Sequence, residues 1–410
     1  MRPDDSEGRI GHYGSRGCKF ESCRAHPSDA FQTCTMLRWG RFARWASYYD
    51  AAAEIGPGRV LAKLTERIVK DPLPIVDKPA PALAEPSARS RARLVFMYGG
   101  QGTQYHLMGK QLYDTDPSFR HAMDRCSAAH QAAGGHSLID AVYDPTGRGK
   151  AFDDVLTSHP ALYCIGYSLT ETLREQGIRP DLVLGHSLGE YIAATVAGVM
   201  TFEDGLHLVM RQARLLDEHR PGGMLSVLAP PALYRARGDL FQGVSLAGVN
   251  FEGNFVVSGE TGELARVQAA LDSEGVIVVR LPVRQGFHSP QLEGMRADVV
   301  ALARTIPLRH PRLPLYSSTY ASSVDPSTPE RRDSYLWDII RQRVRFDELI
   351  ASEFSTPDRY FFLDLSASGS FANFIKHGYG PAFRCAPAIN QFGNNVASMK
   401  KLREEVVALQ

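Results

Sequence analysis

A serine stands between two glycines where an apolar run gives way to a helical pattern, in the segment Gly185-His186-Ser187-Leu188-Gly189. This order is typical of a nucleophile elbow, a sharp strand-to-helix turn that exposes a serine hydroxyl. The amides and the dipole at the start of the following helix favour negative charge beside that hydroxyl. The alternative is an ordinary turn that carries a surface serine. We predict that Ser187 is a nucleophile that forms an acyl-enzyme.

A serine nucleophile also needs a base and donors for the oxyanion. His288 follows the apolar segment 276–279 and lies in a predicted loop, where a histidine without a catalytic role is also common. A second apolar strand runs into the glycine-rich loop 99–104, whose amides could face an oxyanion. That loop could instead be a simple turn or a phosphate loop. Nucleotide binding is disfavoured because the lysine and the spacing of a Walker A motif are missing.

Together these segments resemble the malonyl-CoA:acyl-carrier-protein transacylase family, which includes the acyltransferases of polyketide synthases. The family pattern is a Gly-Gln-Gly-Ser/Thr-Gln loop, then Gly-His-Ser-x-Gly, then a later His-Ser element. These correspond to 100–104, 185–189 and 288–289, and the likeness covers about 94–400. The resemblance implies an α/β fold, with a hydrolase-like parallel-sheet core and an inserted ferredoxin-like small subdomain.

The resemblance also implies roles for individual residues. Ser187 would be the nucleophile and His288 the base, and the backbone amides of Gln101 and Leu188 would form the oxyanion hole. In this family a main-chain carbonyl orients the histidine, and the matching position falls near Gln342.

One position departs from the malonyl-transferring members. These carry an arginine on the helix after the elbow, where its guanidinium pairs with the malonyl carboxylate. Counting from Leu208-Val209 places Gln212 at that position, with Arg211 beside it. Adjacent residues on a helix point about 100° apart, so the two side chains cannot face one pocket in a regular helix. The alternative is a register one residue away, with Arg211 as the anchor.

A neutral amide cannot offset a buried carboxylate, so Gln212 predicts poor binding of malonyl and tolerance of neutral acyl groups. Glutamine here resembles the acyl hydrolases of trans-acyltransferase polyketide assembly lines, and Phe287 before His288 favours a small acyl group. The hypothesis is therefore an enzyme that removes short neutral acyl groups from acyl carrier protein by hydrolysis. The alternative is an acyl-carrier-protein S-malonyltransferase that uses malonyl-CoA.

Two further alternatives belong to other classes. An α/β-hydrolase esterase would have its catalytic histidine near the C-terminus and often a His-Gly-Gly-Gly loop, but His288 comes too early for that order and no such loop is present. A non-catalytic docking module would not need both Ser187 and His288.

Composition limits the remaining classes. The chain has 410 residues, 44% hydrophobic and 22% charged, and its formal net charge is +1, so nothing favours nucleic acid. No apolar run suggests a membrane span or a signal peptide, which predicts a cytoplasmic protein. The scattered cysteines predict no metal site. We expect no resident cofactor, because the acyl groups arrive on the phosphopantetheine of acyl carrier protein or CoA.

Four arginines could form a basic patch for that acidic carrier, or simply a solvated face: Arg284, Arg341, Arg343 and Arg345.

The chain divides into segments of different character. We predict disorder over 1–35, a remnant resembling the C-terminal end of an upstream acyltransferase over 36–70, and a Pro/Ala-rich linker over 71–93. The large subdomain is predicted at 94–222 and 287–400, and the small one at 223–286. Strands are predicted at 94–98, 181–185, 225–228, 245–249, 254–258, 276–282, 313–317 and 360–365. Helices are predicted, among others, at 188–199, 203–218 and 261–273.

Overall fold

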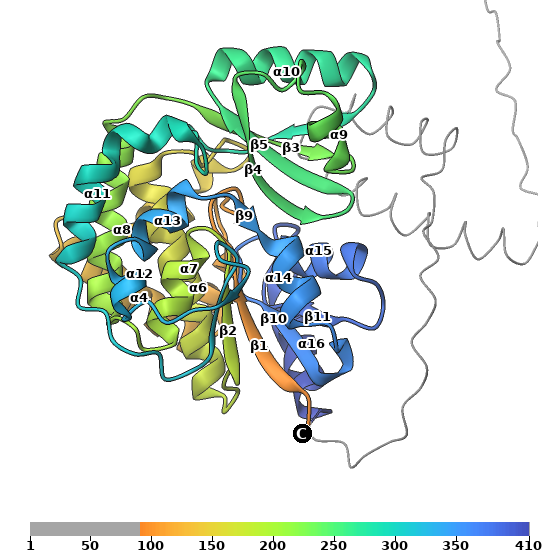
Figure 1. Ribbon diagram of the computed structural model, residues 1–410. Coiled ribbons are helices and arrows are strands. Elements are labelled where there is room, and N and C mark those ends of the chain that lie inside the picture. Colours follow the sequence, from red (N-terminus) through yellow and green to blue (C-terminus); the bar gives the residue numbers. More distant parts are fainter. Residues whose placement is uncertain (1–90, 410) are drawn as a thin grey trace, which may run out of the picture. The chain divides into compact units, whose positions relative to one another are not determined.

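The computed structural model describes residues 91–409, and Figure 1 shows their arrangement. The segments predicted as disordered (1–35) and as an acyltransferase remnant (36–70) lie outside the described residues, as does most of the predicted linker (71–93). The linker was predicted to extend to residue 93, but strand β1 already begins at Arg93, which pairs with Tyr360 on the neighbouring strand.

A six-stranded sheet forms the centre of the large subdomain, in the order β11-β10-β1-β2-β7-β8. All neighbouring strands are parallel except the last pair. The predicted parallel α/β core is therefore confirmed. The strands are β1 (Arg93–Tyr98), β2 (Leu182–Gly185), β7 (Leu315–Ser317), β8 (Ser322–Ser323), β10 (Tyr360–Asp364) and β11 (Arg384–Pro387).

Alternating side chains of β1 pack on opposite faces of this sheet, as the two-residue period of a strand requires. Phe96 and Tyr98 join a large cluster with helices on one face, whereas Val95 and Met97 join a smaller cluster with α14 (Phe346–Glu353) and α15 (Ser370–Gly378). Both faces are covered, which explains why the central strands read as continuous apolar runs. The larger layer includes α4 (Pro117–Ala132), α6 (Val155–Glu175), α7 (Gly189–Val196), α8 (Phe202–Asp217), α11 (Arg296–Arg304), α13 (Tyr335–Arg341) and α16 (Asn395–Val407).

The remaining short helices connect these elements. They are α3 (Lys110–Thr115), α5 (Leu138–Tyr143), η1 (Pro145–Gly147), η2 (Pro290–Met295), α12 (Pro329–Arg332) and η3 (Pro357–Arg359).

Several element ends differ from the prediction for local reasons. Helix α7 stops at Val196, before the predicted 199, because Gly198 takes a left-handed conformation (φ +82°). The strands predicted at 276–282 and 313–317 are shorter than expected, since Pro282 and Pro314 have no amide hydrogen for a ladder.

The small subdomain is a second sheet with two helices. Its four antiparallel strands run in the order β6-β3-β5-β4, and the chain follows a strand-helix-strand-strand-helix-strand series. The predicted ferredoxin-like subdomain is confirmed. Its elements are β3 (Gly223–Leu228), α9 (Ala232–Ala236), β4 (Val244–Phe251), β5 (Asn254–Gly259), α10 (Thr261–Ser273) and β6 (Ile277–Arg280).

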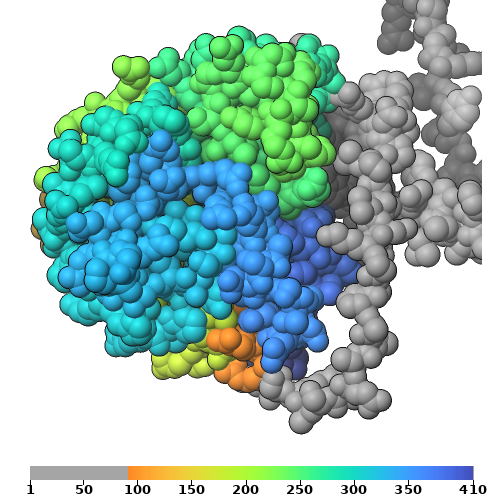
Figure 2. Space-filling view, in the orientation of Figure 1, coloured from red at the N-terminus to blue at the C-terminus, as the bar shows by residue number. Residues whose placement is uncertain are grey.

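The sequence did not indicate a fifth strand of this sheet. Strand β9 (Val344–Arg345) comes from the large subdomain and pairs in parallel with β4, where Val344 lies opposite Gly248. A Cβ on Gly248 would lie 3.0 Å from the Val344 Cβ, so a small residue favours this close pairing. The two subdomains therefore share a sheet edge, and Figure 2 shows the green and light blue atoms of these regions in contact.

Within residues 91–409, no helix has both the length and the apolar character needed to cross a membrane.

Candidate active site

Ser187 lies at the turn between β2 and α7 in a strained left-handed conformation, with φ +54°. The amide of His186 donates to the Tyr98 carbonyl at 3.0 Å, which holds the turn against the end of β1. A Cβ on Gly189 would lie only 2.1 Å from the same carbonyl oxygen, so only glycine fits there. The structure thus forms the turn that the Gly-x-Ser-x-Gly pattern predicts.

The structure brings together the three residues expected to act on the proton of the serine. Ser187 Oγ lies 2.8 Å from His288 Nε2, and His288 Nδ1 lies 2.7 Å from the carbonyl oxygen of Gln342. A carbonyl can only accept, so Nδ1 carries the hydrogen and Nε2 is the acceptor for the serine proton. This is the tautomer that a general base needs.

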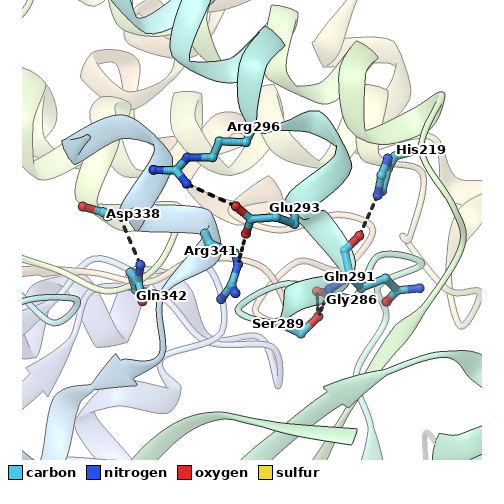
Figure 3. A network of polar contacts seen from close by, with 9 residues as sticks. All are labelled: His219, Gly286, Ser289, Gln291, Glu293, Arg296, Asp338, Arg341 and Gln342. Atoms are coloured by element: carbon cyan, nitrogen blue, oxygen red, sulfur yellow. Dashed lines mark hydrogen bonds and ion pairs between the residues drawn. The ribbon is translucent and has the colours of Figure 1, made fainter. Parts of the chain in front are cut away.

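Helix α13 holds His288 from two sides. The His288 amide donates to the Ile340 carbonyl at 2.8 Å, and the Gln342 carbonyl accepts from the ring. Arg341 lies between these two acceptors along the chain and pairs with Glu293 of η2 at 2.8 Å (Figure 3). His288, the predicted base, is therefore positioned by main-chain carbonyls at the end of a braced helix.

Burial controls the protonation state of both histidines at the elbow. It lowers the pKa of His288 to about 4, although the bond to the Gln342 carbonyl opposes this shift. Burial also lowers the pKa of His186 to about 3, and the nearby His288 adds to this effect. His186 lies edge-on to Phe371, with ring centroids 4.7 Å apart, and bonds to Asn250 at 3.2 Å. Both rings are thus neutral near pH 7, and His186 packs against Phe371 beneath the elbow.

The glycine-rich loop lies against the elbow. A Cβ on Gly100 would lie 2.8 Å from the Leu188 amide nitrogen, which shows how closely the two backbones approach. Within the described part of the chain, neither the Gln101 amide nor the Leu188 amide donates a hydrogen bond. The side chain of Gln104 braces the loop by accepting from the Gly102 amide at 2.7 Å. The arrangement leaves two free donors at the predicted oxyanion position.

On helix α8, the structure shows which of the neighbouring residues Arg211 and Gln212 faces inward. Arg211 is exposed, whereas Gln212 is completely buried. Gln212 Nε2 donates to the Tyr191 hydroxyl at 2.7 Å, and that hydroxyl donates to the Leu336 carbonyl at 2.9 Å. Gln212 Oε1 has no partner among the described residues. Gln212 thus faces the protein interior behind the elbow helix and does not itself line the cleft.

The cleft beside Ser187 lies between the subdomains and has about 670 Å³ of space, part of it open to solvent. Of the sequence-predicted residues, Gln101, Ser187, Phe287 and His288 line it. No lysine, arginine, aspartate or glutamate of residues 91–409 belongs to the lining. The other residues that line the cleft are Gly102, Thr103, His186, Met224, Ser226, Ala247, Gly248, Asn250, Val256, Leu281, Val344, Ser370, Phe371 and Phe374.

The sequence analysis did not predict a buried carboxylate that lies near the elbow. Glu190 on α7 is completely buried and accepts from the Thr319 amide at 2.9 Å, from its hydroxyl at 2.7 Å, and from Ser317 at 2.6 Å. Burial raises the pKa of Glu190 to about 7, and these hydrogen bonds oppose the shift. An acidic residue directly after Gly189 in an apolar helix was the available signal. Glu190 fastens the elbow helix to the end of β7.

The four arginines considered for a basic patch are all paired with carboxylates. Arg284 lies 2.7 Å from Asp153, and Arg341 lies 2.8 Å from Glu293. Arg343 and Arg345 share Glu348. Their charges are therefore largely compensated within the chain, which weakens the case for a basic patch.

Comparison with known proteins agrees with this geometry. The family model of the acyl transferase domain matches residues 95–393. The chain belongs to the acyl transferase domain family. The polyketide biosynthesis acyltransferase homolog BaeD of Bacillus velezensis is 33% identical to this acyl transferase over 320 residues, which are 77% of this chain and 97% of BaeD.

Two further comparisons extend this result. The polyketide biosynthesis protein ThaF of Burkholderia thailandensis is 35% identical over 310 residues, which are 75% of this chain but only 26% of ThaF. Among solved structures, a loading acyltransferase from the avermectin modular polyketide synthase superposes with a TM-score of 0.69 at 25% identity. That match covers 76% of this chain and 99% of the loading acyltransferase. The predicted family is therefore confirmed.

Proposed function

We propose that this acyl transferase removes short neutral acyl groups from acyl carrier protein in polyketide biosynthesis, through an acyl-Ser187 intermediate that water hydrolyses. Membership in the family supports acyl transfer, and the relatives BaeD and ThaF carry polyketide biosynthesis in their names. The preference for a short neutral acyl group and the use of water as the acceptor go beyond what the family membership supports.

The observation that carries the proposal is the absence of a fixed positive charge at the cleft. Gln212 stands at the position where malonyl-transferring relatives have arginine, the neighbouring Arg211 is exposed, and the described lining has no lysine or arginine. A malonyl carboxylate would be buried without a partner, which costs several kcal/mol. An acetyl group carries no such charge.

The geometry supports a two-step reaction. His288 Nε2 takes the proton from Ser187 Oγ as this oxygen attacks the thioester carbonyl, and the oxyanion faces the amides of Gln101 and Leu188. The C–S bond breaks, and the protonated His288 gives its proton to the departing phosphopantetheine sulfur. In the second step, water attacks the ester and passes a proton to His288. The carboxylic acid leaves and Ser187 recovers its hydrogen.

The alternative function is acyl-carrier-protein S-malonyltransferase. It would use the same Ser187, His288 and oxyanion donors, with a thiol as the second acceptor. Only the binding of the malonyl carboxylate and the final acceptor separate the two functions.

The test uses one carrier protein loaded separately with acetyl and with malonyl groups. After incubation with the enzyme, intact-mass measurement gives the fraction of carrier that has lost its acyl group. We expect loss of acetyl and retention of malonyl, with Ser187→Ala as the inactive control. Stable loading of free carrier protein from malonyl-CoA would instead establish the malonyltransferase.

A further inference from the structure

A buried histidine behind the cleft has no role in the steps above. His159 lies on α6 and is 1% exposed. It does not line the cleft, yet it contacts two residues that do. Its Nδ1 bonds to Nε2 of Gln101, and its ring stacks on Phe287 with centroids 5.6 Å apart and an interplanar angle of 25°.

These two contacts lie on separate loops of the reaction machinery. Gln101 carries one of the amides at the oxyanion position, and Phe287 directly precedes the base, His288. The loops are far apart in the sequence, so no local turn fixes their relative placement. A single side chain that contacts both can set the distance between the oxyanion donors and the base.

The hydrogen bond to Gln101 has a defined direction. The side-chain nitrogen of Gln101 carries hydrogens, so His159 Nδ1 accepts and its other ring nitrogen carries the proton. The same nitrogen of Gln101 also donates to Ser158 Oγ at 3.2 Å. Burial lowers the pKa of His159 to about 3, so the ring stays neutral and Nδ1 remains an acceptor at ordinary pH.

We infer that His159 is a positioning residue that fixes the oxyanion loop, through the Gln101 side chain, relative to the loop of the catalytic base. The inference rests on the proposed acylation of Ser187, but not on water as the final acceptor, because acylation precedes that step. The placement of an oxyanion donor affects the rate of acylation more than the binding of the substrate.

Two substitutions separate the contacts of His159. His159→Phe keeps a ring to stack on Phe287 but removes the acceptor for Gln101. His159→Asn keeps an acceptor near the position of Nδ1 but removes most of the ring. Gln101→Ala removes the side-chain donor and leaves the backbone amide in place. His130→Phe is the matched control, because His130 is also buried (2% exposed) and does not line the cleft.

The readout is the rate at which Ser187 is acylated by acetyl carrier protein, followed by intact mass in single turnover. We expect His159→Phe and Gln101→Ala each to lower this rate about tenfold, less than the roughly hundredfold or greater loss of a whole oxyanion donor. The KM should change little, and the double variant should be no slower than either single one. His159→Asn should retain most of the rate, and His130→Phe all of it.

A second readout does not depend on the natural substrate. A fluorophosphonate modifies a serine that has a base and oxyanion donors, and the same ranking of variants is expected for its reaction at Ser187. Additive losses in the double variant, or an equal loss in His159→Asn and His159→Phe, would overturn the inference. If wild-type Ser187 reacts with neither reagent, the proposed function and the role of His159 both fail. If acylation follows this ranking but a thiol is the acceptor, only the proposed hydrolysis fails.

Discussion

The two sides of the cleft differ in how completely their polar groups are paired. On the catalytic side, each nitrogen of His288 has a partner, and the helix that holds this ring is braced by the Glu293–Arg341 ion pair. On the side predicted to select the acyl group, Gln212 lies behind the cleft lining with its Oε1 buried without a partner among the described residues, and no lysine or arginine of residues 91–409 lines the cleft. The arrangement around His288 suits any acyl transfer, whereas the proposed discrimination against malonyl depends on the region around Gln212.

The largest expected effect comes from removing the proposed nucleophile. Ser187→Ala should abolish acylation, with a loss of at least about 10³-fold in deacylation of acetyl carrier protein, because no other nucleophile faces His288 Nε2. Intact-mass measurement of the enzyme should show no acyl adduct. Ser226→Ala is the matched control, since Ser226 also lines the cleft but does not contact the base. An equal loss in this control would contradict the assignment.

A smaller effect tests the acyl-selecting side. Gln212→Arg introduces a longer, charged side chain directly behind the cleft lining. If the guanidinium reaches the acyl group, as the proposal requires, we expect the ratio of malonyl to acetyl acylation to rise by about tenfold or more, corresponding to at least ~1.4 kcal/mol of carboxylate pairing. Competition between the two loaded carriers, read by intact mass, gives this ratio. Arg211→Gln should leave the ratio unchanged because Arg211 is exposed. A changed ratio in Arg211→Gln alone would identify Arg211 as the anchor.

Phe287 tests the size of the acyl group. Its ring is 3% exposed and lines the cleft directly before the base. Phe287→Ala should raise kcat/KM for hexanoyl relative to acetyl thioesters by about tenfold or more, since room for even one or two of the added methylenes, each worth ~1 kcal/mol or more in an apolar pocket, is enough for that factor. Assays with N-acetylcysteamine thioesters of increasing chain length measure this. An unchanged chain-length profile would place the limit on acyl size elsewhere in the cleft.

The smallest expected effect is a weak dependence on pH. His288 must be neutral to accept the serine proton, and burial lowers its pKa to about 4. Activity should therefore be lost only as pH falls through about 4. Between about pH 7 and about pH 5.5, kcat/KM should change less than twofold, whereas a histidine of ordinary pKa would lose about tenfold. The profile is measured with circular dichroism as a check on folding, and an acid limb near pH 6.5 would contradict it.

Much of the fold followed from local patterns. The strand, turn and helix around Ser187 are predictable because two glycines and an apolar run leave few conformations for the segment. The ferredoxin-like order was predictable from the alternation of short strands and helices over 223–286. Strand β9 was not, because two residues carry no periodicity and their pairing with β4 depends on the close approach at Gly248.

The site residues, like the fold, include some that the sequence could predict and others that only the packed structure shows. Ser187, His288 and the loop at Gln101 belong to three motifs that together resemble one family, so their proximity could be predicted from that resemblance. The contacts of Glu190 and His159 could not be predicted, because they are made with segments distant in sequence. Only Glu190 had a local signal, as an acidic residue in an apolar helix. The sequence showed that Gln212 replaces the arginine of malonyl-transferring relatives. It could not show where the Gln212 side chain points, because only the packed structure shows its amide bonded to Tyr191.

The most direct test of the central claim is the lifetime of the acetyl-enzyme. Acetyl-Ser187 would be formed with acetyl-N-acetylcysteamine, freed of excess reagent, and followed by intact mass in buffer alone and with added holo carrier protein. The account predicts that the acetyl group disappears in buffer alone, at a rate that carrier protein does not increase. An acetyl-enzyme that persists in buffer and discharges only onto the carrier thiol would contradict hydrolysis and make this protein a transferase.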